Sequence, residues 1–443
     1  MKFKTVLVTL CILIAGICVN AGSAEERYII KFNDAVQLFN ADGSESAKDY
    51  CSVTADELQE YIDAGVVESY GIDYVVELDT KSWNLSNIKA EFPEKLGCTG
   101  QDVKVAVIDS GMVSGFAGNA LEGYNYLDGN TDTDDTMGHG TAVSAIIAST
   151  SYGVAYNAQF VPLKCFESDV TTYTSDIIDA VVDAVDVYDC DVINMSFSFT
   201  GDAGGTAVQT FKEKVDYAAE KGAILIASVG NDGDDTLNYP AAFTNVIGVG
   251  SVDADNKWSD FSNYNSSVFV TAPGEGLSLF GVTLSGTSFS APHVSGLAAV
   301  AKCIEKGITV EGFANVLSAT SVREDDSGEN NNKYDVYCGY GVIDCEAAVK
   351  KIIENDAMFI SPVVVSESMT SAVIYNNTVS DRTVCCICAY YDENGRLTEC
   401  IPVNVEINSG DVYGFNNEYS KGYTQYFVWS GLETLTPLAK PKG

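Results

Sequence analysis

The hydrophobic pattern between about residues 100 and 306 alternates between two kinds of segment. Short apolar runs predict buried strands, and longer stretches with apolar residues every three or four positions predict helices. The predicted strands are Val103–Ile108, Gln159–Cys165, Asp191–Ser196 and Ala223–Ser228. The predicted helices are His139–Ser149, Thr174–Val187, Thr206–Lys221 and Ser290–Lys306. This alternation predicts an α/β fold with a mainly parallel sheet and right-handed crossovers.

The pattern differs on either side of this region. Before it, Tyr28–Phe32 and Tyr74–Leu78 are predicted strands separated by a helical stretch at Ala55–Ala64, which indicates a small α+β unit. After about Asn355 the predicted segments are all strands: Met358–Val365, Ser371–Tyr375, Arg382–Tyr391, Arg396–Val405 and Gln425–Trp429. Asn394-Gly395 is a hairpin signal between two of them, so residues 355–443 are predicted to form a separate β-sandwich-like domain.

The first 24 residues have the pattern of a signal peptide. A start with two lysines is followed by an apolar run, Val6–Val19, that is too short to cross a bilayer. Small residues then offer cleavage after Ala21 or Ala24. Ile17 before Cys18 is the wrong size for a lipoprotein signal. No later segment is apolar enough to span a membrane, so we expect a secreted, extracellular protein.

Composition narrows the class of partner. The 443 residues suffice for two or three domains, and 46% hydrophobic with 20% charged residues indicates a globular chain. The net charge of −37 argues against nucleic acid or anionic membrane as a partner, because phosphate binding needs clusters of Lys and Arg. A solvated acidic surface is the simplest interpretation.

The cysteine count leaves the redox state open. Of 13 cysteines, Cys11 and Cys18 belong to the predicted signal, and Cys51 belongs to the α+β unit. The remaining ten permit disulfides, although buried free thiols are equally consistent with their apolar neighbourhoods. One hairpin register places Cys388 opposite Cys400, which suggests a disulfide there. We expect no zinc site, because the C-terminal region has no histidine.

Three residues with the chemistry of nucleophilic catalysis stand at the ends of predicted elements. Asp109 follows a buried strand, His139 opens a helix, and Ser288 stands between small residues just before another helix. A serine at a helix start is exposed, and nearby backbone N–H groups and the helix dipole favour an oxyanion. The only other histidine, His293, is five residues after Ser288 in the same predicted helix and is therefore poorly placed as its base. Each residue also has an ordinary structural interpretation, as a turn or a helix cap.

Five motifs in one order resemble the subtilisin-like serine peptidases, the subtilases (peptidase family S8). They are Val105-Ala-Val-Ile-Asp-Ser-Gly111, Gly138-His-Gly-Thr141, Val192-Ile-Asn-Met-Ser196, Ala227-Ser-Val-Gly-Asn-Asp232 and Gly286-Thr-Ser-Phe-Ser-Ala-Pro-His293. The resemblance covers roughly Trp83 to Ile353. It implies a three-layer fold in the catalytic domain, residues 83–354, and a serine endopeptidase that acts on protein or peptide substrates.

The resemblance also implies a role for each motif residue. Asp109, His139 and Ser288 correspond to the catalytic triad, and the side-chain amide of Asn231 to an oxyanion donor. Residues 25–82 resemble the inhibitory propeptide, with processing expected between Asp79 and Asn84. A permanent small domain is the alternative. Tyr239-Pro240 resembles a turn beside the cleft that can hold a cis bond.

Two segments are expected to line the substrate cleft. One wall is formed by Ser196, Phe197 and Ser198, and the other by Ser228, Val229 and Gly230. The family usually has glycine at the positions of Ser198 and Phe199, so side chains there are expected to narrow the cleft or to restrict which peptides enter. Neither wall carries a carboxylate, which favours an uncharged residue before the scissile bond.

No cofactor is expected, and a structural calcium ion is not predicted. Oxygen-rich loops bind calcium, but this acidic loop lacks the EF-hand pattern, so we interpret its residues as solvated. They are Asp128, Asp132, Asp134 and Asp135. Two other functions stay open: a processing peptidase with one dedicated exported peptide as substrate, and a non-catalytic binding protein that keeps the fold.

Overall fold

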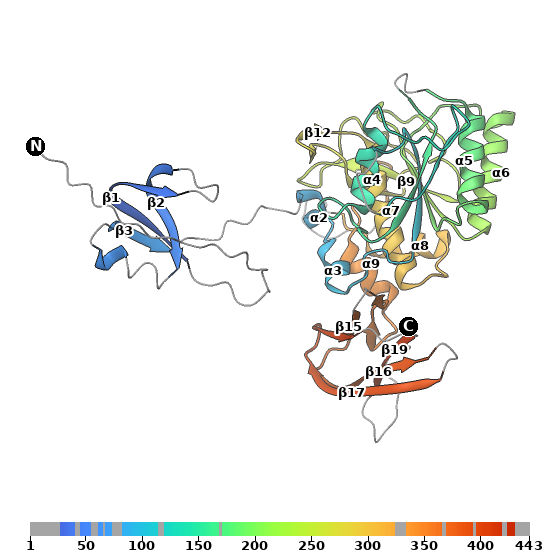
Figure 1. The fold of residues 1–443 in the computed structure, drawn as a ribbon. Helices are drawn as coiled ribbons and strands as arrows, with labels where there is room; N and C mark the ends of the chain where they lie inside the picture. The colour runs from blue at the N-terminus through green and yellow to red at the C-terminus, as the bar shows by residue number, and fades with distance from the viewer. Residues whose placement is uncertain are drawn as a thin grey trace, which may run out of the picture. The chain divides into compact units, whose positions relative to one another are not determined.

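The structure is a computed structural model that describes eleven stretches of the chain (Figure 1). The described residues are 27–39, 45–54, 61–64, 67–72, 82–113, 119–167, 171–323, 334–365, 369–392, 396–418 and 423–429. They divide into two compact units, Met1–Thr80 and Lys81–Gly443. This division falls two residues before the predicted start of the catalytic domain at Trp83. The predicted signal peptide, 1–24, lies outside the described residues.

The first unit contains an antiparallel sheet with the strand order β2-β1-β3. Its strands are β1 (Arg27–Phe39), β2 (Glu45–Thr54) and β3 (Val67–Ile72). The predicted strand Tyr28–Phe32 lies within β1. The strands β2 and β3 were not predicted, since polar residues interrupt their apolar alternation. The predicted strand Tyr74–Leu78 lies outside the described residues, and of the predicted helix only 61–63 are described as helical.

The second unit is built around a seven-stranded sheet with the order β10-β9-β8-β7-β4-β6-β5. Its neighbouring strands are all parallel, which confirms the predicted fold class. The strands are β4 (Lys104–Asp109), β5 (Tyr124–Asn125), β6 (Gln159–Lys164), β7 (Val192–Met195), β8 (Ile224–Ser228), β9 (Val246–Val252) and β10 (Val270–Pro273).

Helices cover both faces of this sheet and bury alternate strand residues (Figure 1). Ala106 and Ile108 of β4 belong to the apolar cluster with α5 (Thr174–Asp186) and α6 (Thr206–Glu220). Val105 and Val107 belong to the cluster on the opposite face. The helices of that face are α4 (His139–Ala148), α7 (Thr287–Ile304), α8 (Val310–Thr320) and α9 (Cys345–Ile352). None of the helices in the described ranges is both long and apolar enough to cross a membrane.

An arm at the start of this unit, made of α2 (Trp83–Asn87) and α3 (Glu91–Lys95), is held against α7 and α9 by polar contacts. Asn84 is 1% exposed, and its Nδ2 donates to Nε2 of His293 in α7 at 2.6 Å. The ammonium of Lys89 pairs with Asp344, the residue that caps α9, also at 2.6 Å. Because an unpaired buried polar group is costly, these contacts fix where the arm packs.

The C-terminal region is a pair of antiparallel sheets around a shared core. One sheet joins β13 (Met358–Ile360), β14 (Val364–Val365), β15 (Met369–Asn376) and β18 (Val412–Glu418). The other has the order β17-β16-β19, with β16 at Arg382–Tyr391, β17 at Leu397–Ile407 and β19 at Tyr423–Trp429. Ile374 of the first sheet packs with Cys386 and Val428 of the second. The ring of Tyr375 contacts Phe92 of α3 edge-on, with centroids 5.8 Å apart.

The predicted disulfide between Cys388 and Cys400 is wrong. The register of β16 and β17 pairs Ala389 with Cys400 and places Cys388 opposite Ile401. Cys388 is therefore buried in the core, whereas Cys400 is exposed on the other face of the sheet. All ten cysteines of the second unit are described, and each is a free thiol.

Asn84→Ala should lower the thermal unfolding midpoint, because it leaves the buried Nε2 of His293 without its hydrogen-bond donor. Such a loss costs about 1–3 kcal/mol. Asn87→Ala is the matched control, since Asn87 lies in the same short helix and makes only a 3.3 Å contact to the exposed Ala254 carbonyl. Scanning calorimetry of both variants checks this. Equal midpoints in the two variants would contradict the importance of the Asn84–His293 contact.

Candidate active site

The predicted site lies at the carboxyl end of β4, near the middle of the parallel sheet. After β4 the chain builds β5 and β6 on one side and then β7 to β10 on the other, so the order of strands reverses here. Ligand sites in open parallel sheets form at such a reversal, outside the carboxyl ends of the strands. Asp109 is the last residue of β4.

The side chains of Asp109 and His139 form a direct hydrogen bond. The Nδ1 of His139 lies 2.7 Å from Oδ1 of Asp109, and the same oxygen accepts a 2.7 Å hydrogen bond from the Ser110 backbone N–H. The Asp109 side chain is 4% exposed, whereas that of His139 is 30% exposed. A buried carboxylate thus orients an imidazole whose other nitrogen is left for chemistry.

A second acidic residue, Asp135, organises the loop just before the helix that begins with His139. The Asp135 carboxylate accepts hydrogen bonds from the N–H groups of Met137, Gly138 and Thr141 and from the hydroxyls of Thr141 and Ser110. It therefore satisfies one unpaired N–H group in the first turn of α4, that of Thr141, and two N–H groups of the loop just before the helix. The solvated interpretation is wrong for Asp135, which is 6% exposed. Asp128, Asp132 and Asp134 are exposed, as that interpretation requires.

The close approach of α4 to the end of β4 requires glycine at position 140. A Cβ at Gly140 would collide with the carbonyl oxygen of Gly111 and lie 3.2 Å from Cβ of Asp109. The Ser110 hydroxyl, just after β4, also links the two elements, since it accepts a 2.9 Å hydrogen bond from the Gly140 N–H. In the sequence Gly138-His139-Gly140, the second glycine is therefore required for steric reasons, next to a histidine that is placed for its chemistry.

Ser288 is the second residue of α7, which packs against α4. It is partly exposed, unlike its buried neighbours Thr287 and Phe289. The ring of His139 lies 5.4 Å from that of Phe289, centroid to centroid, so the imidazole stands beside the first turn of α7. The Ser196 hydroxyl donates to the Ser288 carbonyl at 2.8 Å and ties this turn to the end of β7.

Asn231 is oriented by the residue that precedes Ser288. Its Oδ1 accepts from both the N–H and the hydroxyl of Thr287, at 2.8 and 2.9 Å. The side-chain amide is therefore anchored by its oxygen, and its Nδ2 lies 3.6 Å from where a Cβ of Gly286 would be. An amide N–H group held in this way next to a serine is suited to donate to a developing oxyanion.

The two histidines have opposite pKa shifts. Burial alone would lower the pKa of His139, but attraction and hydrogen bonding by Asp109, together with the charge of Asp135, raise it above its ordinary value. Burial lowers the pKa of His293 to about 4. His293 contacts the Phe289 carbonyl and Asn84 and lies away from the site, so the structure gives it a structural role.

Comparison with known proteins identifies the family. Residues 100–341, more than half of the chain, match the family model described as "Subtilase family". The chain belongs to the subtilase family. It is therefore a serine-type endopeptidase, a hydrolase.

Individual subtilases match much of the chain. An alkaline proteinase of Hapsidospora chrysogena is 30% identical over 346 residues, which cover 72% of this chain and 84% of that protein. Subtilisin DY of Bacillus licheniformis is 31% identical over 288 residues, or 61% of this chain and 99% of that protein. A solved protease of Pseudoalteromonas arctica superposes with a TM-score of 0.51 at 25% identity and covers 62% of this chain and 95% of its own.

The residues of the predicted wall after β7, and Phe199 next to them, make several contacts within the fold of this subtilase. The ring of Phe199 packs between Phe211 of α6 and Tyr239, with centroids 6.2 and 5.9 Å away. Phe197 packs against Phe166 at 5.4 Å, and the Ser196 hydroxyl is already bonded to α7. Only Ser198 is exposed among the three predicted wall residues.

In the other predicted wall, residues 228–230, the side chains are buried or absent. Ser228 and Val229 are 2% and 0% exposed, and Gly230 has φ +111°. The buried residue Asn238 links the two walls and was missed from the sequence: it accepts from the Thr200 hydroxyl at 3.1 Å and donates to the Val229 carbonyl at 3.3 Å. Its neighbouring bond, Tyr239–Pro240, is cis.

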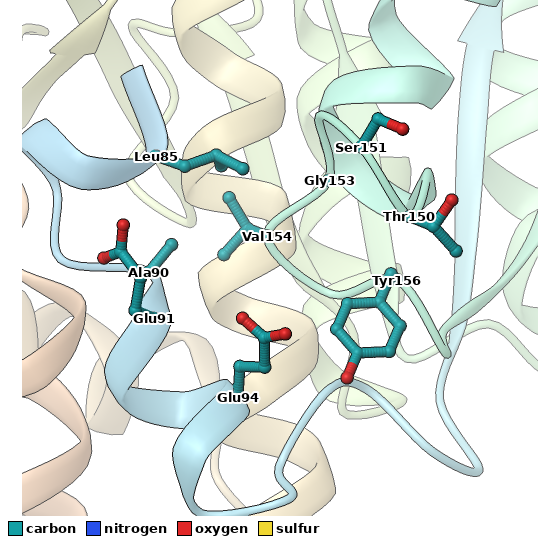
Figure 2. Close-up of a pocket in the computed structure, with 9 residues that line it drawn as sticks. All are labelled: Leu85, Ala90, Glu91, Glu94, Thr150, Ser151, Gly153, Val154 and Tyr156. Carbon is teal, nitrogen blue, oxygen red and sulfur yellow. The ribbon is translucent and has the colours of Figure 1, made fainter. Parts of the chain in front are cut away.

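A small pocket between the arm and the loop after α4 contains none of the predicted site residues (Figure 2). It is lined by Leu85, Ala90, Glu91, Glu94, Thr150, Ser151, Gly153, Val154 and Tyr156. Within the described ranges, His, Cys, Asp and Glu side chains nowhere gather in threes that could hold a metal ion.

The raised pKa of His139 predicts the pH at which activity is lost on the acid side of the pH profile. A protonated imidazole accepts no proton, so kcat/KM should fall as the pH drops through a pKa above 6.5, the ordinary value. Asp135→Asn removes one raising charge and should move the midpoint of this limb to lower pH. A pH profile of peptide hydrolysis checks both. A wild-type midpoint below 6.5, or an unmoved midpoint in the variant, would contradict the account.

Proposed function

We propose that this subtilase hydrolyses peptide bonds with Asp109, His139 and Ser288 as its triad and Asn231 as an oxyanion donor. The observation that carries the proposal is the 2.7 Å contact between His139 and the buried Asp109, beside the turn that bears Ser288. An imidazole oriented by a carboxylate and placed next to a serine at a helix start is the arrangement that serine hydrolysis needs.

The proposed reaction proceeds through an acyl-enzyme. Ser288 Oγ forms a bond to the carbonyl carbon while His139 Nε2 takes the hydroxyl proton. Asp109 holds Nδ1–H and stabilises the imidazolium, and Asn231 Nδ2 with the Ser288 N–H binds the oxyanion. His139 then protonates the amine as the C–N bond breaks. Water, activated by His139, releases the acyl group and restores Ser288.

The chain supplies the nucleophile, the base and the oxyanion donors of this reaction. We therefore propose no cofactor requirement, and any calcium would act on stability alone. Activity that is unchanged after chelation agrees with this proposal.

The N-terminal unit is proposed to act as an intramolecular inhibitor that the enzyme removes itself. Asn84 is buried in its contact with His293, so cleavage is best placed on the Asp79 side of Trp83, which leaves this contact intact. Secretion is proposed from the charged and apolar pattern of residues 1–24, which would be removed during export.

For substrates, we propose an uncharged residue before the scissile bond. The two predicted walls contain serine, phenylalanine, valine and glycine, and their side chains include no carboxylate. Such a pocket offers a cationic side chain no countercharge, and burying an unpaired charge is costly.

Ser288→Ala should abolish self-processing. Wild type should lose its residues up to the Asp79–Asn84 region, and the variant should retain them, as read by intact mass and N-terminal sequencing. On peptides the variant should lose on the order of 10⁶ in kcat, the size of effect found for subtilisin, itself a subtilase. Equal processing and equal peptide hydrolysis in both proteins would contradict the triad.

A peptide-library profile checks the proposed pocket. Uncharged residues should dominate the position before the cut, because neither wall offers a countercharge. A profile dominated by Lys or Arg at that position would overturn this assignment, while leaving the triad untouched.

A further inference from the structure

The loop that carries Asn231 is hydrogen-bonded to a buried side chain from another segment of the chain. Asn263 is 0% exposed and lies in the connection between β9 and β10. Its Oδ1 accepts from the N–H groups of Asp232 and Gly233 at 2.7 and 3.1 Å. Its own backbone N–H donates to the Gly230 carbonyl at 3.1 Å. Asn263 therefore bonds to the chain on both sides of Asn231.

We propose that Asn263 is a positioning residue for the oxyanion donor. It contacts no reacting atom; it fixes the backbone of residues 230–233, from which the Asn231 side chain extends. This inference rests on the proposed role of Asn231.

Two anchors are needed because each fixes a different part of Asn231. Thr287 holds the amide oxygen and so determines how the side chain is rotated. Asn263 holds the main chain and so determines where the side chain begins. Gly230, at φ +111°, is enclosed between the Nδ2 atoms of Asn238 and Asn263, so this part of the loop has little room to shift.

The Asp232 N–H depends on Asn263 more than the Gly233 N–H does. The Gly233 N–H also reaches the Phe261 carbonyl at 2.9 Å, whereas Asn263 Oδ1 is the acceptor found for Asp232 in the described part of the chain. Loss of that acceptor frees the peptide unit next to Asn231. Because oxyanion donors act only when aligned, a shift of about 1 Å costs up to about 10²-fold in rate.

The test compares Asn263→Leu, Asn263→Asp and Asn265→Leu in the full-length, processed protein. Leucine keeps the volume but removes the acceptor, and kcat should fall about 10- to 100-fold with KM little changed. Aspartate keeps the accepting oxygens and should restore most of the rate. Asn265 is the matched control: it is also buried, but it bonds to Ser267 and the Thr236 carbonyl and not to residues 230–233. Its leucine variant should keep the wild-type kcat per active site.

A double mutant separates positioning from general damage. In an Asn231→Ala background, Asn263→Leu should cost less than threefold, because the donor it positions is already gone. Active sites are counted with a serine-directed phosphonate, so that misfolded protein does not lower kcat. If Asn263→Leu does not fold, Asn263→Ser, whose hydroxyl is too short to reach both N–H groups, takes its place.

The outcomes distinguish this inference from the proposed function. If wild type cleaves peptides and Asn231→Ala is impaired, but Asn263→Leu retains the wild-type kcat, the positioning role is wrong and the triad stands. Full additivity of the two losses would also overturn it. If wild type shows no hydrolysis that depends on Ser288, both proposals are wrong.

Discussion

The hydrogen bond between Asp109 and His139 depends on bringing the end of β4 and the start of α4 together. Gly140 supplies the space, since a side chain there would collide with Gly111. Asp135 fixes the loop before α4 and its first turn by accepting from the N–H groups of Met137, Gly138 and Thr141. The negative charge of Asp135 also helps to raise the pKa of His139, so one carboxylate affects both the local fold and the imidazole.

The central strands β4, β6, β7 and β8 and the helices α4 to α7 were predictable because each has a simple pattern, whereas β5, β9, β10, α8 and α9 were not predicted. Fully buried strands such as β4 and β8 appear as continuous apolar runs, and α5 and α6 bury one stripe each. Asp109, His139 and Ser288 could be selected because each stands at or next to the end of such an element, whereas Asn231 was assigned from the resemblance to the subtilases. The environment of Asp135 could not be predicted, since its carboxylate follows three exposed ones in the same loop. The predicted pairing of Cys388 with Cys400 was wrong for a different reason. The register of β16 and β17 shifts by one residue between Tyr390 and Tyr391, and such a shift moves every later side chain to the other face of the sheet.

Buried asparagines were the residues that sequence reasoning missed most consistently. Asn84, Asn238 and Asn263 are each at most 2% exposed, and each bonds to a segment distant in the chain. A pattern of apolar residues carries no information about such contacts, because their partners are set by the tertiary fold. The amides share one physical purpose, which is to satisfy backbone or imidazole groups that water cannot reach. Two of them lie against the substrate walls or the oxyanion loop, so the precision of the site depends on polar groups outside the motifs.

The central claim, that His139 oriented by Asp109 activates Ser288, is tested most directly by labelling with a serine-directed phosphonate and mapping the adduct by mass spectrometry. We predict a single adduct on the peptide that contains Ser288, formed at least about 10³-fold more slowly in His139→Ala and in Asp109→Asn. An adduct on another serine would contradict the account. So would no adduct in folded wild type, or equal labelling rates in the three proteins.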